Sequence, residues 1–396
     1  MRVRVITPGD SASAAPPVIR RAGTWPPSSP WRPRAVLGAQ SPGALRLPDA
    51  HPSAATLYAP RGVWVDQERI IVCDTGNHRV LMWSRLPDRD GTSEQVVLGQ
   101  PDMVTEGQAT RGPGLGMNLP TGVLVDQGRL VVADAWHHRL LVWDRLPTIT
   151  GTPPDHVLGQ PDPVSVEPNA AGETTAGTFY WPFGMAVIDE RFVVADTGNR
   201  RVLIWRDGVP APGQPADVVL GQPSPSAREE NRGGPVAADS FRWPHAIAGT
   251  GTGGLLVADA GNHRVLRWDR HPESDRPADG VLGQPDFAIG TEFPYISQQG
   301  RLRFPYAVST GERAQGLAVA DTANNRVLIW DTVETAFSGD ADQVIGQPDL
   351  AANGENRWDA VGADTLCWPY GLSWHDDLLA VADSGNNRVV LWERTP

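Results

Sequence analysis

Histidine is the residue type that raises the question of metal chemistry in this chain. His78, His138 and His263 occupy the same position of a recurring turn, and His137 directly precedes His138. Zinc requires its nitrogen ligands about 2.0–2.1 Å from one ion, but adjacent side chains generally point apart, and the other two histidines lie in separate turns. We therefore expect no metal ion and no cofactor, and we predict that His137 and His138 contact a ligand.

A second set of candidates follows a repeated proline. The residue after this proline differs from copy to copy, being in chain order Arg61, Thr121, Phe183, His245, Tyr306 and Tyr370. Arginine offers a planar fork of donors and tyrosine a rigid hydroxyl, which favours binding of an anionic or hydrogen-bonding group by Arg61, His245, Tyr306 and Tyr370. The alternative is that these large side chains only fill the centre of the fold. No residue is predicted to be catalytic.

The elements that must position these residues repeat along the chain. Residues 194–205 hold an apolar run, a turn of small and polar residues and a second apolar run ending in Trp205, which predicts a β-hairpin. We expect Gly198 to take the left-handed backbone of the turn. The hairpin recurs every 60 to 63 residues, and its first aspartate is Asp74, Asp134, Asp196, Asp259, Asp321 or Asp383.

Each hairpin also carries an arginine five residues after the aspartate. Because both residues recur in all six copies, we interpret them as parts of the architecture rather than of a site, with the aspartate bonded to turn amides and the arginine holding the turn.

Two further strands flank each hairpin. One apolar strand follows the repeated proline, and a short strand ends in Gly-Gln-Pro after each of the first five hairpins. Four strands per unit at a regular period predict an all-β fold, a six-bladed β-propeller with antiparallel blades. The sixth unit lacks its last strand, and residues 35–42 supply a copy of it. We therefore expect the N-terminal strand to join the last blade and close the ring, with the hairpin tryptophans buried between blades.

In such a propeller, the first strand of each blade lines a central channel. We call the face that carries the hairpin turns and the connections between blades the top face. The connections are long and similar in length. Loops of this kind on a rigid scaffold are typical of binding sites, so we expect them to surround the channel mouth.

The repeated pattern resembles a known family. Pro-x-Gly, an apolar strand, Asp-x-x-Asn-x-Arg and a second apolar strand follow one another as in the NHL repeat, and the resemblance covers residues 35–396. It implies a six-bladed NHL-type propeller. Members of the family bind RNA or proteins, sense ligands or, as peptide-amidating lyases, use zinc, so the fold does not give the function. Three histidines at matching positions of the channel strands, as a zinc site would need, are not seen in this sequence.

Composition separates a tail from the propeller. Residues 1–34 are rich in Pro, Ser and Arg, which predicts a disordered tail over 1–34 and a propeller over 35–396. Within the tail, residues 25–31 contain two tryptophans among prolines, and they either fold back on the propeller or dock a partner. The net charge of −12 makes nucleic acid a poor partner. No apolar run suits a spanning helix or a secretory signal, so we expect no membrane partner and a cytoplasmic location.

These observations favour a binding or scaffolding propeller. We predict a monomer that presents its top face to a protein partner or a small-molecule ligand. Two alternatives stay open: an enzyme of lyase or hydrolase type with its site at the channel mouth, and an RNA-binding NHL module.

Overall fold

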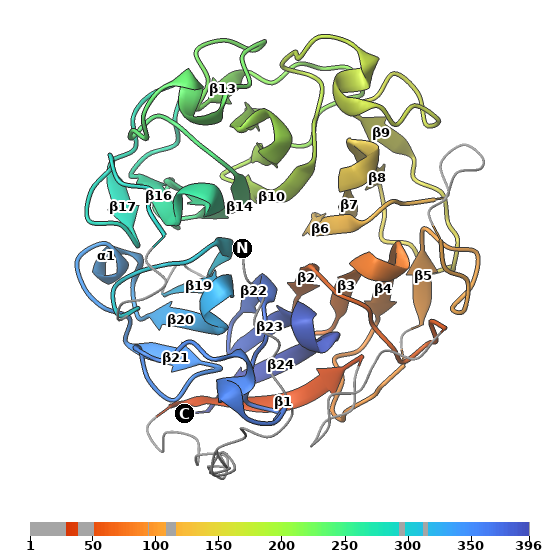
Figure 1. Ribbon diagram of the computed structural model, residues 1–396. Coiled ribbons are helices and arrows are strands. Elements are labelled where there is room, and N and C mark those ends of the chain that lie inside the picture. The colour runs from red at the N-terminus through yellow and green to blue at the C-terminus, as the bar shows by residue number, and fades with distance from the viewer. Residues whose placement is uncertain are drawn as a thin grey trace, which may run out of the picture.

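The computed structural model describes residues 29–38, 51–93, 95–107, 116–292, 298–311 and 316–395. They form six sheets of four antiparallel strands, arranged in a ring around a central axis (Figure 1). The predicted all-β, six-bladed propeller is therefore confirmed. Its one described α-helix is the short α1 (Val333–Ala336).

Each blade has strands A to D, counted outward from the channel. The A strands are β2 (Gly62–Val65), β6 (Pro120–Asp126), β10 (Pro182–Ile188), β14 (Pro244–Gly249), β18 (Pro305–Thr310) and β22 (Pro369–His375). The B strands are β3 (Ile70–Asp74), β7 (Arg129–Asp134), β11 (Arg191–Asp196), β15 (Leu255–Asp259), β19 (Leu317–Asp321) and β23 (Leu378–Asp383). The C strands are β4 (Arg79–Trp83), β8 (Arg139–Trp143), β12 (Arg201–Trp205), β16 (Arg264–Trp268), β20 (Arg326–Trp330) and β24 (Arg388–Arg394). The D strands are β5 (Val96–Leu98), β9 (His156–Leu158), β13 (Val218–Leu220), β17 (Gly280–Leu282), β21 (Gln343–Ile345) and β1 (Trp31–Leu37).

Short 3-10 helices join the B and C strands on the top face. They are η1 (Thr75–Asn77), η2 (Ala135–His137), η4 (Thr197–Asn199), η6 (Ala260–Asn262), η8 (Thr322–Asn324) and η10 (Ser384–Asn386). The described residues of the connections between blades hold three further 3-10 helices, η3 (Pro168–Ala171), η5 (Glu230–Gly233) and η9 (Glu355–Trp358).

The ring is closed by the N-terminal strand, as predicted. β1 pairs antiparallel with β24, so that Val36 lies opposite Val390, and it is the outermost strand of blade 6. β1 also holds blade 1, because the Val36 amide donates to Asp90 Oδ1 at 2.9 Å and the Gly91 amide donates to the Val36 carbonyl at 2.9 Å. β1 thus connects blade 6 with blade 1, the two blades between which the ring closes.

The strand begins at Trp31 rather than at the predicted boundary of residue 35. The Trp31 side chain is fully buried and lies 5.5 Å from the ring of Trp374 in a T-shaped contact. Of the two interpretations of residues 25–31, packing against the propeller therefore holds for Trp31, while residues 25–28 lie outside the described part of the chain.

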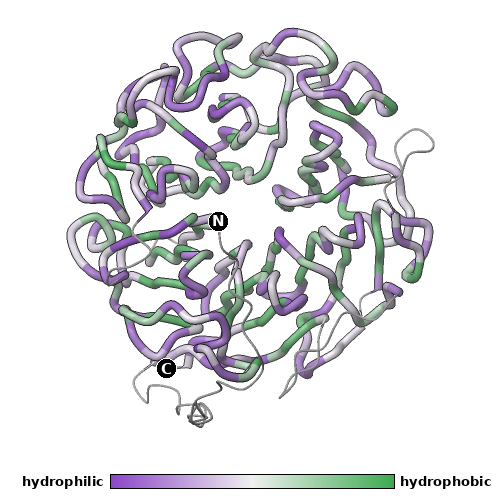
Figure 2. Tube along the Cα trace, in the orientation of Figure 1, coloured by the Kyte–Doolittle hydropathy of each residue, from purple (hydrophilic) through white to green (hydrophobic). Residues whose placement is uncertain are grey.

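The blades pack through apolar side chains on both faces of the B and C strands. Each of these strands is buried along nearly its whole length, and Figure 2 shows hydrophobic residues along the strands and hydrophilic ones in the loops. The six tryptophans that end the hairpins are at most 3% exposed, as predicted. The indole of Trp205, for example, donates to the Gln214 carbonyl at 3.1 Å.

In four of the six blades the residue two after the repeated proline is glycine, and the reason there is steric; the other two blades have Ala246 and Ala307. A Cβ atom on Gly122 would lie 2.1 Å from the Phe183 carbonyl oxygen, and one on Gly371 would lie 2.0 Å from the Arg61 carbonyl oxygen. Neighbouring A strands therefore approach too closely for a side chain at these positions.

Candidate functional site

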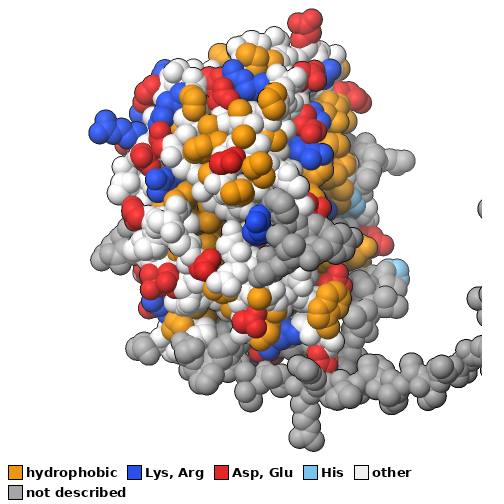
Figure 3. All heavy atoms as spheres, turned by 60° about the vertical axis from the view of Figure 1, so that its left-hand side comes forward, with side chains coloured by type: hydrophobic (Ala, Val, Ile, Leu, Met, Phe, Trp, Pro, Cys, Tyr) orange, Lys and Arg blue, Asp and Glu red, His pale blue; other side chains and the backbone are white. Residues whose placement is uncertain are grey.

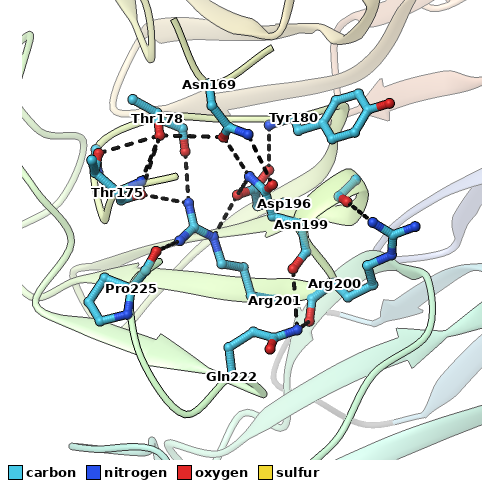
Figure 4. A network of polar contacts seen from close by, with 12 residues as sticks. Asn169, Thr175, Thr178, Tyr180, Asp196, Asn199, Arg200, Arg201, Gln222 and Pro225 are labelled. Atoms are coloured by element: carbon cyan, nitrogen blue, oxygen red, sulfur yellow. Dashed lines mark hydrogen bonds and ion pairs between the residues drawn. The ribbon is translucent and has the colours of Figure 1, made fainter. Parts of the chain in front are cut away.

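The recurring aspartate and arginine form a buried network in each blade, shown for blade 3 in Figure 4. Asp196 Oδ2 accepts from Arg201 Nε at 2.7 Å and from Asn199 at 2.8 Å, while Oδ1 accepts from the Tyr180 amide at 2.8 Å. Arg201 also donates to carbonyls of two connections, those of Pro225, Thr175 and Thr178. The pair therefore joins the hairpin to the loops of the top face. These contacts agree with the prediction that the recurring aspartate and arginine are parts of the architecture.

The details of this network correct two expectations. Asp196 accepts the amide of Tyr180, which precedes strand A, rather than an amide of the turn. The left-handed residue is Arg200, with φ of 54°, and not Gly198. Gly198 is required instead because a Cβ atom there would lie 2.4 Å from the Tyr180 carbonyl oxygen.

The histidines of the turns connect neighbouring blades. The Nδ1 atoms of His78, His138 and His263 accept backbone amides of the next blade at 3.1 to 3.2 Å, those of Leu119, Trp181 and Phe304. Burial lowers the pKa of His138 and of His263 to about 4. A neutral ring is what an acceptor Nδ1 requires. In blades 5 and 6, Asn325 and Asn387 accept the equivalent amides through their side-chain oxygens.

His137 takes the place of the turn asparagine. Its Nδ1 atom lies 2.9 Å from Asp134 Oδ2, where Asn199 binds Asp196 in blade 3. Both His137 and His138 are only 7% exposed. These contacts favour an architectural role for the two side chains, and their contact with a ligand stays a prediction. Within the described ranges, no three His, Cys, Asp or Glu side chains are placed to share a metal ion.

The other four predicted residues come together at the channel mouth. The centroids of Phe183 and His245 lie 4.2 Å apart, and those of His245 and Tyr306 lie 4.4 Å apart. Tyr306 stacks on Tyr370 at 4.5 Å, and the Arg61 guanidinium lies 4.7 Å from the Tyr370 centroid. Side chains of five blades are therefore in contact around one opening, and their binding of a ligand stays a prediction.

Trp136 completes this ring, and sequence reasoning missed it. Blade 2 contributes only Thr121 from strand A, but the Trp136 indole lies 6.0 Å from Phe183 and 5.9 Å from the Arg61 guanidinium carbon. The signal was present, because Trp136 stands where the other turns have Gly76, Gly198, Gly261, Ala323 and Gly385. We call the six side chains the collar: Arg61, Trp136, Phe183, His245, Tyr306 and Tyr370.

The collar and the channel beneath it differ in chemistry. Arg61 is the single charged residue among the described residues that line the channel. Burial, together with the nearby Arg61 cation, lowers the pKa of His245 to about 3, so this imidazole is neutral at pH 7. Burial, and then the neighbouring Tyr370, raises the pKa of Tyr306, which keeps its hydroxyl protonated. Below the collar lies an apolar throat lined by Val63, Val123, Met185, Ile247, Val308 and Leu372.

A larger pocket of about 410 Å³ opens on the opposite face, between blades 2 and 3. Acidic side chains such as Asp126 and Glu190 line it, and Arg129 lies 3.6 Å from Asp144 across it. Both members of that ion pair are more than a third exposed, so water screens their charges. The channel, with its buried and convergent side chains, is the better candidate site.

Comparison with known proteins bears on the type of propeller. Residues 117–143, which span β6 to β8 of blade 2, match the NHL repeat. The chain is thus a six-bladed β-propeller whose second blade matches the NHL repeat. No curated protein matches it, and within its described residues no helix has the length and apolar character needed to cross a membrane.

Three solved structures are similar to this chain. A protein of unknown function from Bacteroides thetaiotaomicron is 10% identical with a TM-score of 0.52, over 92% of this chain and 75% of the other. The WD40 β-propeller domain of Doa1 is 11% identical with a TM-score of 0.48, over 92% and 97% of the two chains. A streptogramin B lyase is 10% identical with a TM-score of 0.46, over 87% and 95%. At such identities the likeness concerns the fold alone.

Proposed function

We propose that this NHL-type propeller is a binding module that receives a small ligand or a protein partner on its top face, anchored at the collar. The observation that carries this proposal is the state of Arg61. Its guanidinium is half-buried between the rings of Tyr370 and Trp136, and it has no ion pair or hydrogen bond to another residue in the described part of the chain. An arginine held out of bulk water without an anion is costly unless a ligand supplies one.

The surroundings of the mouth support a role in docking. Three aromatic side chains are exposed on the connections leading into blades 6 and 1: Tyr58 at 48%, Trp358 at 79% and Trp368 at 38%. Exposed tryptophan and tyrosine are typical of the residues that dominate binding energy at interfaces. They lie close in sequence to Arg61 and Tyr370, so one sector of the top face combines an anion site with apolar contact surface.

The two alternatives, an enzyme and an RNA-binding module, are not supported by a comparable feature of the described residues. An enzyme of lyase or hydrolase type needs an acid–base pair, but His245 is neutral and no carboxylate lines the described channel. RNA binding needs concentrated positive charge, whereas acidic and basic side chains are interspersed over the face in Figure 3. A cytoplasmic location, a monomeric state and a disordered tail over 1–34 remain proposals that rest on the sequence.

Loss of the collar donors is expected to abolish capture while the fold stays intact. The test variant combines Arg61→Ala with Tyr306→Phe and Tyr370→Phe, and the control combines Arg206→Ala with Tyr180→Phe, which are outside both the collar and the exposed aromatic sector. Each protein is incubated with native cell extract, and retained small molecules and proteins are identified by mass spectrometry. Because hydrogen bonds to a charged group contribute about 1.5–3 kcal/mol each, we expect at least about tenfold less retention by the test variant.

The control should retain the same species as the wild type, and all three proteins should melt at similar temperatures. Equal retention by the test variant, with a normal melting temperature, would place the site away from the channel mouth. The connections around Trp358 would then be the next region to test.

A further inference from the structure

We propose that the channel binds a short-chain aliphatic monocarboxylate, with its carboxylate on Arg61 in the collar and its hydrocarbon chain in the throat. This inference rests on the proposed function, since it names the ligand that the collar would receive. It is carried by three features of the channel: one unpaired cation, neutral polar groups beside it, and an apolar space directly below.

The cation is presented in a fixed orientation. The Arg61 guanidinium carbon lies 4.7 Å from the centroid of Tyr370 and 5.9 Å from that of Trp136. Contacts with these two rings restrict the guanidinium, and its N–H groups point outward in its own plane. A carboxylate matches two parallel N–H donors of a guanidinium in a bidentate arrangement. The donors of Arg61 are therefore available to the carboxylate of such a ligand.

The collar favours one negative charge over two. His245 and Tyr306 belong to the same ring of side chains as Arg61 and add no charge at pH 7, because the imidazole is neutral and the phenol is protonated. No lysine occurs in the chain, and no second arginine lines the channel among the described residues. Inorganic phosphate is a mixture of monoanion and dianion at pH 7. Its dianion would leave one charge unmatched in a site with apolar walls, which is costly, and neither form has a hydrocarbon chain to place in the throat. A monoanion is compensated by Arg61 alone.

The throat selects for the rest of the ligand. Val63, Met185, Ile247 and Val308 are each at most 9% exposed, and with Val123 and Leu372 they line the channel directly below the collar. The channel cavity has a volume of about 100 Å³, smaller than the roughly 150 Å³ of an apolar cavity that accepts benzene. This space suits a chain of a few carbon atoms. Apolar surface buried there would add affinity at about 0.8 kcal/mol per methylene.

The test is isothermal titration calorimetry of the full-length protein at pH 7 with a ligand series. The probes are acetate, butanoate, hexanoate, dodecanoate, the neutral isostere butanamide, and inorganic phosphate. We expect butanoate to bind with affinity rising about fourfold per methylene from acetate, and dodecanoate to gain nothing over hexanoate. Butanamide and phosphate should bind at least about tenfold more weakly than butanoate. Arg61→Leu should lose butanoate binding, and the matched Arg206→Leu should retain it.

Three results would overturn the inference: butanoate binding that survives Arg61→Leu, equal binding of butanamide, or phosphate binding as tight as that of butanoate. Failure of this inference differs from failure of the proposed function. If no probe in the series binds, but retention from cell extract still depends on the collar, the ligand class is wrong and the binding module stands. If retention is also independent of the collar, both fail.

Discussion

Removal of residues 1–42 is expected to leave a chain that cannot form a soluble closed ring. The deletion takes away β1, and with it the partner of β24 and the hydrogen bonds of Val36 to blade 1. It also uncovers the side chains that Trp31 and Val36 bury in blade 6, including Trp374. An unpaired β24 with an exposed apolar face is a ready template for pairing with another chain, so we expect aggregation rather than partial unfolding.

The matched control is a deletion of residues 1–28. This deletion leaves Ser29 and the whole of β1 in place. This shorter deletion should give a soluble monomeric protein with the melting temperature of the full chain. Both deletions are expressed in parallel and compared by soluble fraction, size-exclusion chromatography and thermal unfolding. A soluble protein without residues 1–42 that melts normally would show that the ring closes without β1.

The architecture was predictable because repetition exposes it in the sequence. Six copies of one hairpin pattern indicate six blades. The sixth copy has no strand D after it, and the matching segment at residues 35–42, ahead of the first blade, indicates that the N-terminal strand closes the ring. The same repetition separates Asp196 and Arg201, which recur, from His245 and Tyr306, which occupy a variable position. Comparison of the copies with one another thus identified both the scaffold and most of the channel mouth.

The remaining features depend on contacts between blades, which the pattern of one copy does not contain. The role of His138 is set by the Trp181 amide of the next blade, and the place of Trp136 at the channel mouth is shown by its contact with Phe183 of that blade. Position 198 requires glycine because Tyr180 lies so close, and not because of its own backbone conformation. Such constraints arise from distances between segments far apart in the chain, and only the folded geometry shows them.

Substitution of Arg201 by methionine is expected to lower the free energy of unfolding by about 3–5 kcal/mol, the usual effect of removing one partner of a buried ion pair. The Arg201 and Asp196 side chains are both 0% exposed, and their closest atoms lie 2.7 Å apart. Methionine fills similar volume but leaves the Asp196 carboxylate without its cation. It also removes the donors to Pro225, Thr175 and Thr178, so the connections on either side of blade 3 lose their attachment.

The control is the same substitution at Arg206, an arginine in the same blade whose side chain is 43% exposed and which pairs with Glu273 at 3.0 Å. Water screens that pair, so Arg206→Met should change the free energy of unfolding by less than about 1 kcal/mol. Urea denaturation followed by tryptophan fluorescence measures both variants, because Trp205 is buried in the same blade. Equal denaturation midpoints for the two variants would mean that the recurring pair adds little stability. The recurrence of aspartate and arginine in all six hairpins would then have to be explained by the positioning of the top-face loops.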